Sequence, residues 1–174
     1  MKKWLYLVLC LMFLLACKNS VYNEINVYLN GERLEFDVSP MIVENHVMMQ
    51  VCVVFEALGA DVFWIPDYQR FVANIGDAPW GGGFQFVMSI NEPQVNVNFP
   101  VDSTIILLDI PPMVVDGLML VPLQAISKSL RVSREWCEEL QALDVDIDWC
   151  EEYPMLGTNI EWMAETQTVL MSLD

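Results

Sequence analysis

Apolar and polar positions alternate along much of the chain with the two-residue period of a β-strand. Ile25, Val27 and Leu29 alternate with polar residues and precede Asn30-Gly31, the pair most typical of a two-residue hairpin turn. The same period predicts further strands at five places, namely 41–43, 47–49, 61–64, 71–75 and 84–90. Most of the chain is therefore expected to form antiparallel strands.

The period changes to that of a helix at two places. Apolar residues recur with helical spacing from Val51 to Leu58, and Gly59 is placed to cap the C-terminus of that helix. A second helix is expected to begin at Pro122, because proline suits the first helical turn. Strands with two helices predict an α+β fold.

The second half of the chain repeats the first. Residues 36–45 align with residues 108–117 at an offset of 72, and residues 57–64 align with residues 142–149 at an offset of 85. The second copy therefore carries 13 extra residues, which we place in an inserted helical segment near 127–139. A repeat of this kind identifies the structural unit.

The repeat predicts the domain organisation. We expect two tandem diverged repeats, about 25–92 and about 93–174, each a twisted antiparallel sheet packed around one helix. A unit of that size is marginally stable alone, so the two copies are expected to share one core. Trp64 and Trp149 end matching strands and are the expected equivalent anchors in that core.

The first residues have the pattern of an export signal. A basic start precedes an apolar run over 4–16, which is shorter than the roughly 18 residues needed to span a membrane. The run ends in Leu-Leu-Ala-Cys17, which resembles the lipobox of bacterial lipoproteins, in which the cysteine is acylated. We expect a signal peptide over 1–16, lipidation at Cys17 and a short linker to residue 24. The alternative is an ordinary secretory signal that contains a cysteine.

The charge balance restricts the partners. The chain has 24 acidic and 8 basic residues and a net charge of −16, which becomes −18 once Lys2 and Lys3 leave with the signal. Such a field repels nucleic acid and anionic lipid headgroups. We therefore expect no nucleic-acid partner and a membrane attachment that is covalent. The location that follows is exported and lipid-anchored at the cell membrane, on its extracellular or periplasmic side.

The residue types that carry catalysis or bind metals are sparse. His46 is the only histidine and falls in the expected turn 44–46, whereas a transition-metal site needs several converging ligands. Asp144, Asp146 and Asp148 alternate with apolar residues, which favours a solvated strand face over a calcium site. No local catalytic motif is present. We expect no enzyme activity, no metal and no cofactor.

The cysteines after the signal have different expected roles. Cys52 falls on the apolar face of the first helix, where a free thiol behaves as a small hydrophobe. Cys137 and Cys150 lie in or beside the insertion, and export permits their oxidation. Spacing cannot decide between a disulfide and two unpaired thiols, so both alternatives stay open.

Two tryptophans are candidates for ligand binding. Trp80 adjoins three consecutive glycines, and Trp162 lies in the corresponding connection of the second copy. Exposed aromatic rings there would form a sugar-stacking or partner-binding surface. The alternative is that both rings cover the edge of the core.

Taken together, these motifs resemble those of the N-terminal domain family of copper amine oxidase. The matching segments share its strand, turn and helix-start motifs and are Val27 to Gly31, Leu108 to Pro112, Val121-Pro122-Leu123, and Glu56 to Ala60 with Trp64. The resemblance covers residues 25–174, but Gln124 replaces an arginine of the family pattern and Met49-Gln50 replaces its Val-Pro. It implies a twisted antiparallel sheet around a helix, used as a stalk in secreted proteins, and it does not imply copper.

The expected function is a non-catalytic, lipid-anchored cell-surface stalk or interaction domain. Its expected partners are the membrane, through the lipid, and an envelope protein, a glycan or a second copy of the chain. The rival is a cell-wall or carbohydrate-binding module that uses Trp80 and Trp162.

Overall fold

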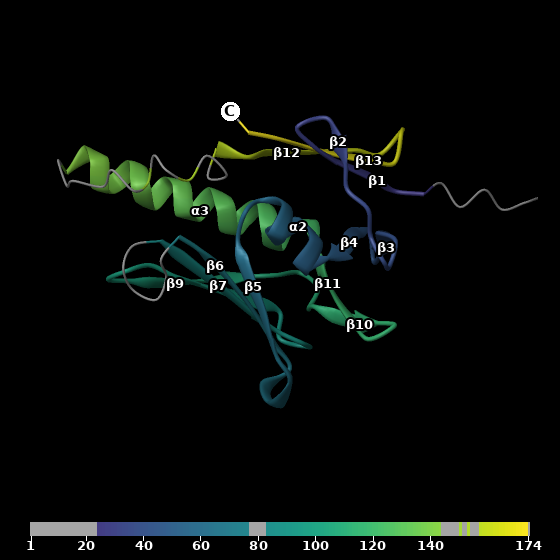
Figure 1. The fold of residues 1–174 in the computed structure, drawn as a ribbon, viewed down its shortest axis with the longest axis horizontal. Helices are drawn as coiled ribbons and strands as arrows, with labels where there is room; N and C mark the ends of the chain where they lie inside the picture. The colour runs from purple at the N-terminus through teal and green to yellow at the C-terminus, as the bar shows by residue number, and fades with distance from the viewer. Residues whose placement is uncertain (1–23, 77–82, 144–149, 151–152, 154–156, 174) are drawn as a thin grey trace, which may run out of the picture.

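Three β-sheets and two α-helices, with a short 3-10 helix at Pro66–Tyr68, make up most of the described part of the protein. The computed structural model describes residues 24–76, 83–143 and 157–173, together with Cys150 and Tyr153. The two helices lie between a sheet that contains the first strand and a sheet of five strands (Figure 1). The protein is thus a mixed α and β structure with mostly antiparallel sheets.

The large sheet is an antiparallel meander in the order β5-β6-β7-β8-β9. Its strands are β5 (Asp61–Ile65), β6 (Arg70–Ile75), β7 (Phe84–Ser89), β8 (Gln94–Asn98) and β9 (Ser103–Leu107). Alternate side chains of the middle strands are buried, as the two-residue period of the sequence predicts. The strands expected over 61–64, 71–75 and 84–90 are confirmed to within one residue.

The central sheet joins two hairpins in the order β10-β11-β4-β3. Its strands are β3 (Met41–Val43), β4 (His46–Gln50), β10 (Met113–Val115) and β11 (Leu118–Pro122). Glu44 and Asn45 both have positive φ, so the first turn has two residues and not three. His46 therefore belongs to β4, where it pairs with Val43. The expectation that His46 is a turn residue was wrong.

The two hairpins meet through a symmetric register between β4 and β11. Met49 lies opposite Val121, with the pairs Met48–Pro122 and Gln50–Leu120 on either side. Each strand leads directly into a helix, so this register fixes both helix starts next to each other.

Helix α2 (Val51–Ala57) and helix α3 (Leu123–Ala142) follow β4 and β11. Gly59, with φ of 84°, ends the first helix as expected. The second helix begins one residue later than expected, because Pro122 still pairs in β11. Helix α3 has 20 residues and helix α2 has 7. The difference equals the 13 extra residues that the sequence alignment places in the second half.

The terminal sheet has the order β12-β13-β1-β2. Its strands are β1 (Asn26–Leu29), β2 (Glu32–Arg33), β12 (Asn159–Met163) and β13 (Thr168–Ser172). The turn at Asn30-Gly31 has positive φ at both residues, as the hairpin prediction requires. Strand β1 pairs in parallel with β13, which brings together segments that are far apart in the sequence.

The expectation of one antiparallel sheet for each repeat was wrong. Each of the three sheets contains strands from both 25–92 and 93–174, and the β1–β13 pair is parallel. A strand at the edge of a sheet has unpaired N–H and C=O groups. Where a strand of one half pairs with a strand of the other, the facing edges of both strands form hydrogen bonds. The halves are thus interlocked through their backbones.

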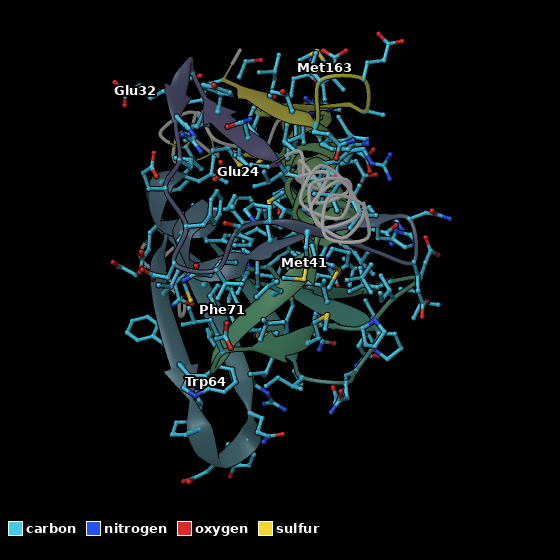
Figure 2. All side chains as sticks on the ribbon, turned by 90° about the vertical axis from the view of Figure 1, so that its right-hand side faces the viewer. Glu24, Glu32, Met41, Trp64, Phe71 and Met163 are labelled. Atoms are coloured by element: carbon cyan, nitrogen blue, oxygen red, sulfur yellow. A yellow bond between two sulfur atoms is a disulfide. The ribbon has the colours of Figure 1, made fainter. Side chains whose placement is uncertain are left out.

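The main core draws on both halves of the chain, from Ile25 to Met171, as expected. Trp64, in contrast, is 46% exposed, so the expectation that it anchors the core was wrong. It lies on the edge strand β5, at the end of the sheet in Figure 2, where few neighbours cover it. Phe71, its partner on β6, is buried. Trp149 lies outside the described residues.

Candidate functional site

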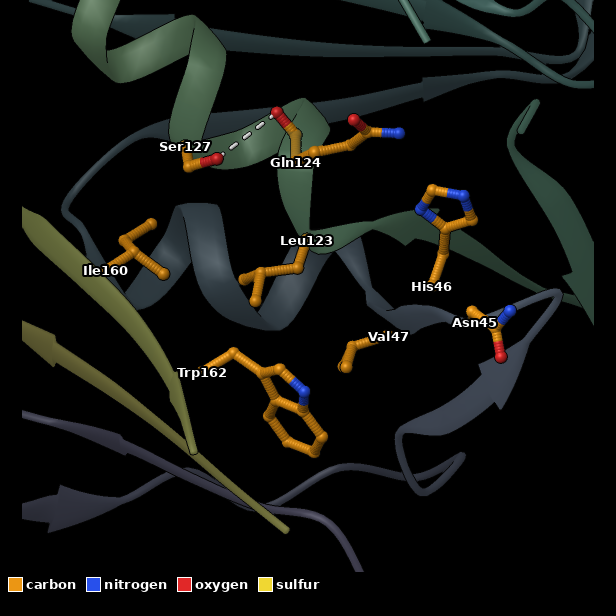
Figure 3. Close-up of a pocket in the computed structure, with 8 residues that line it drawn as sticks. All are labelled: Asn45, His46, Val47, Leu123, Gln124, Ser127, Ile160 and Trp162. Carbon is orange, nitrogen blue, oxygen red and sulfur yellow. Dashed lines mark hydrogen bonds between the residues drawn. The ribbon is translucent and has the colours of Figure 1, made fainter. Parts of the chain in front are cut away.

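A groove of about 230 Å³ opens where the central sheet, the terminal sheet and the start of α3 meet (Figure 3). Its lining combines four apolar and four polar side chains, namely Val47, Leu123, Ile160, Trp162, Asn45, His46, Gln124 and Ser127. The mixture of an aromatic ring with hydrogen-bonding groups is typical of sites for small polar ligands.

Regular secondary structure positions each wall of the groove. Ile160 and Trp162 lie two residues apart on β12 and therefore on one face of the strand. Leu123 and Ser127 are four residues apart on α3 and share one face of the helix. Strand β4 and the turn before it supply the third wall. Side chains held on strands and helices are placed more firmly than side chains on loops.

Gln124 is the one groove residue with an unsatisfied buried atom. Its Nε2 is buried and has no hydrogen-bond partner among the described residues. An unmade buried hydrogen bond of this kind costs about 1–3 kcal/mol. The backbone oxygen of Gln124, in contrast, accepts a hydrogen bond of 3.3 Å from the Ser127 hydroxyl.

A row of amides on the outer face of the large sheet shows the usual arrangement for comparison. Asn98 Nδ2 donates to Gln85 Oε1 and Gln85 Nε2 donates to Asn74 Oδ1, both at 3.0 Å. The exposed side chains of Phe63 and Ile105 lie on the same face, as their register with β6 to β8 requires. Since these more open amides are paired, the unpaired Nε2 of Gln124 is unusual among the described residues.

Of the sequence candidates, the structure places Trp162 in the groove and leaves Trp80 outside the described residues. Sequence reasoning missed His46 and Gln124 as groove residues. His46 was assigned to a turn that is one residue shorter. The departure of Gln124 from the family motif was the signal that could have drawn attention to it.

Cys137 and Cys150 are bonded to each other, with their Cα atoms 6.3 Å apart, and both are buried. Trp136, next to Cys137, stacks on Phe99 with ring centroids 4.9 Å apart and meets Phe84 edge-on at 6.0 Å. The aromatic cluster holds this part of α3 against the large sheet, and the disulfide ties the helix to the chain that follows it.

Cys52 is a free, partly buried cysteine on α2. Burial, and secondarily the negative charge of Glu56, raise the pKa of its thiol above the ordinary value. A neutral thiol is a poor nucleophile, so this environment does not activate Cys52.

The remaining candidates have simple outcomes. Asp144, Asp146 and Asp148 lie outside the described residues, as does Cys17. Within the described residues, no group of three or more His, Cys, Asp or Glu side chains could hold a metal ion. No helix of that part is both long and apolar enough to cross a membrane.

The fold and groove define a small module of mixed α and β structure. The family model for the copper amine oxidase N-terminal domain matches residues 28–145, and the chain belongs to this family of non-catalytic domains. Comparisons with curated proteins and with solved structures give no match. Because the family match ends before β12, Ile160 and Trp162 lie outside it.

Proposed function

We propose that this protein is a lipid-anchored, exported and non-catalytic module that displays a rigid domain at the cell surface. Membership of a non-catalytic domain family supports the absence of chemistry. The Leu-Leu-Ala-Cys17 sequence supports acylation at Cys17, with residues 1–16 removed. The structural observation that carries the proposal is the position of β1, the strand that follows the linker, inside the terminal sheet.

Strand β1 is an interior strand of the terminal sheet, between β13 and β2. Four successive residue pairs join it to β13, from Asn26–Thr168 to Leu29–Met171. Val27 and Val169, a pair in the middle of this ladder, are both buried in the core. A pull on the anchor along β1 therefore loads several backbone hydrogen bonds together, which suits a domain tethered by its N-terminus.

We propose further that the two halves are diverged copies of one unit, about 25–92 and 93–174. The supporting observation is the register of β4 and β11, in which Met49 faces the residue 72 positions later, Val121. The flanking pairs, Met48–Pro122 and Gln50–Leu120, exchange places about this centre at the same offset. Two equivalent strands related by a twofold axis pair in this self-complementary way.

Cell fractionation of the wild type and a Cys17→Ser variant tests the anchor. The wild type is expected in the membrane fraction, with an N-terminal Cys17 that carries a diacylglyceryl group by mass spectrometry. The variant is expected to lose the lipid and leave the membrane fraction. A Cys10→Ser variant is the matched control, because Cys10 lies within the apolar run, and it should fractionate like the wild type. Membrane retention of unlipidated Cys17→Ser protein would contradict the proposal.

The second candidate function is carbohydrate binding at the envelope. The groove favours it, because Trp162 and four hydrogen-bonding side chains line one small cavity. A contribution from Trp80 remains part of this candidate. A protein partner and self-association are the alternatives, and neither requires the groove to be occupied.

A further inference from the structure

We propose that the Trp162 groove binds one residue of a neutral sugar that carries an acetamido group. The inference rests on the second candidate function and names its ligand class. It is argued from the size of the groove, its apolar wall, its unpaired donor and the charge around it.

The size of the groove fits a single sugar ring. Its volume of about 230 Å³ is below the roughly 300–1,000 Å³ that is typical of sites for drug-sized ligands. It equals the space of roughly eight water molecules. A longer glycan would therefore place one residue in the groove and extend the others along the surface.

The apolar side chains suit the less polar parts of such a sugar. The indole of Trp162 is partly exposed on β12, and Val47, Leu123 and Ile160 lie around it (Figure 3). The C–H face of a sugar ring packs on an indole face, and the indole keeps a polar N–H for a hydrogen bond. The methyl of an acetamido group adds an apolar contact that a plain hexose lacks.

The unpaired donor points to the acetamido group. The Nε2 of Gln124 has no partner among the described residues, and an acetamide carbonyl is a strong acceptor. The last side-chain torsion of glutamine is broad, so the amide can turn toward the groove that it lines. His46 and Asn45 offer both donors and acceptors to sugar hydroxyls.

The charge around the groove favours a neutral ligand. Glu44 adjoins Asn45 in the turn at the groove and has an exposed side chain. The whole chain has a net charge of −16. These negative charges oppose the approach of a sugar that carries a carboxylate or phosphate.

Calorimetric titration of the full chain with N-acetylglucosamine and its soluble oligomers tests the ligand class. Binding is expected in the millimolar to micromolar range, and glucose is expected to bind at least about tenfold more weakly. Equal binding of glucose would overturn the acetamido assignment. Absence of heat with all the acetylated sugars would overturn the site.

Three substitutions locate the binding. Trp162→Ala should weaken it by about tenfold or more, whereas Trp64→Ala, which changes an exposed tryptophan of the large sheet, should leave it unchanged. Gln124→Met removes the donor with little change in shape. It should weaken binding and raise the melting temperature, because it also removes an unsatisfied buried group.

A combined loss of affinity and gain of stability in Gln124→Met is a result that a merely structural role would not give. If Trp162→Ala does not fold, Trp162→Phe keeps an aromatic ring and should retain part of the affinity. Binding that neither the Trp162 nor the Gln124 variants alter would overturn the proposal. If the sugars do not bind but membrane attachment still requires Cys17, the sugar-binding proposal is wrong and the proposed function as a lipid-anchored module is unaffected.

Discussion

The two helices differ in length almost threefold, yet both stabilise the same core. Helix α2 has seven residues, of which Val51, Val54 and Phe55 are buried between the sheets. Helix α3 has 20 residues, continues along the large sheet and contributes to the core as far as Cys137. The short helix depends on tertiary packing, because isolated helices of fewer than about 12 residues are marginal in water.

Helix α3 contains side-chain interactions that α2 lacks. Ser129 and Ser133 are buried, and their hydroxyls donate to the carbonyls four residues earlier, Ala125 at 2.6 Å and Ser129 at 3.0 Å. The exposed side has the pairs Arg131–Glu135 and Arg134–Glu138, which contribute little. The comparison indicates that α2 secures the centre and that the aromatic cluster and the disulfide secure the extension.

The largest expected effect is at the centre of α2. Phe55 is fully buried, with ring centroids 5.6 Å from Phe71 and 5.2 Å from Phe86. Phe55→Ala should lower the free energy of unfolding by about 3–5 kcal/mol, measured by urea denaturation. Phe63→Ala, at an exposed phenylalanine of β5, is the control and should have a small effect. Equal effects of the two variants would contradict this view of the core.

The disulfide should have the next largest effect. Cys137 and Cys150 are 13 positions apart, and closing a loop of that length stabilises the folded state by about 3 kcal/mol in the chain-entropy account. A Cys137→Ser, Cys150→Ser double variant should lose about that amount. Reducing agent should lower the melting temperature of the wild type and leave that of the double variant unchanged. If reducing agent left the melting temperature of the wild type unchanged, that result would contradict the disulfide.

Two tryptophans sharpen the comparison between the helix extension and the sheet edge. Trp136 is partly buried and stacked, so Trp136→Ala should cost about 2–3 kcal/mol. Trp64→Ala should cost less than about 1 kcal/mol, because Trp64 is 46% exposed. Parallel denaturation curves measure both values. A larger loss for Trp64 than for Trp136 would show that the edge strand carries more of the stability.

The smallest expected effect concerns Cys52 on α2. Its raised pKa means that alkylation of the native protein should be slow near pH 8 and should accelerate only as the pH passes the ordinary thiol range. Glu56→Gln removes the second cause of the shift and should increase the rate at a fixed pH by less than about tenfold. Because the pKa of Cys52 is higher in the folded state, the unfolded chain loses the thiol proton at a lower pH than the folded state. The contribution of this thiol to stability is therefore lost as the pH rises from the ordinary thiol pKa through the raised pKa of the folded state. Rapid labelling at pH 7 would contradict the assignment.

Local structure was predictable from the sequence because short-range signals fix it. Asn30-Gly31 and Gly59 have the positive φ that their turn and cap require. The prediction that Trp64 anchors the core was wrong because the exposure of a side chain depends on whether its strand lies at a sheet edge. A sequence repeat does not show which strands lie at an edge. The pairing of β1 with β13 joins residues far apart in sequence, and no local pattern encodes a parallel partner at that distance.

The groove was predictable only in part for the same reason. Trp162 was a candidate from its residue type and position, but its partners His46 and Gln124 come from β4 and α3. The turn before His46 has two residues in place of the three expected, and that one-residue difference decides whether the imidazole lies in a turn or on a strand. The groove forms only because the interlocked sheets bring β4, β12 and the start of α3 together.

Differential scanning calorimetry tests the central claim, that the two halves form one interlocked unit, most directly. The full chain, Phe55→Ala in the first half and Trp136→Ala in the second should each show one transition, with calorimetric and van't Hoff enthalpies equal. Both substitutions should lower the temperature of that same transition. Two transitions, each shifted by only one of the substitutions, would contradict the claim and show that the halves unfold independently.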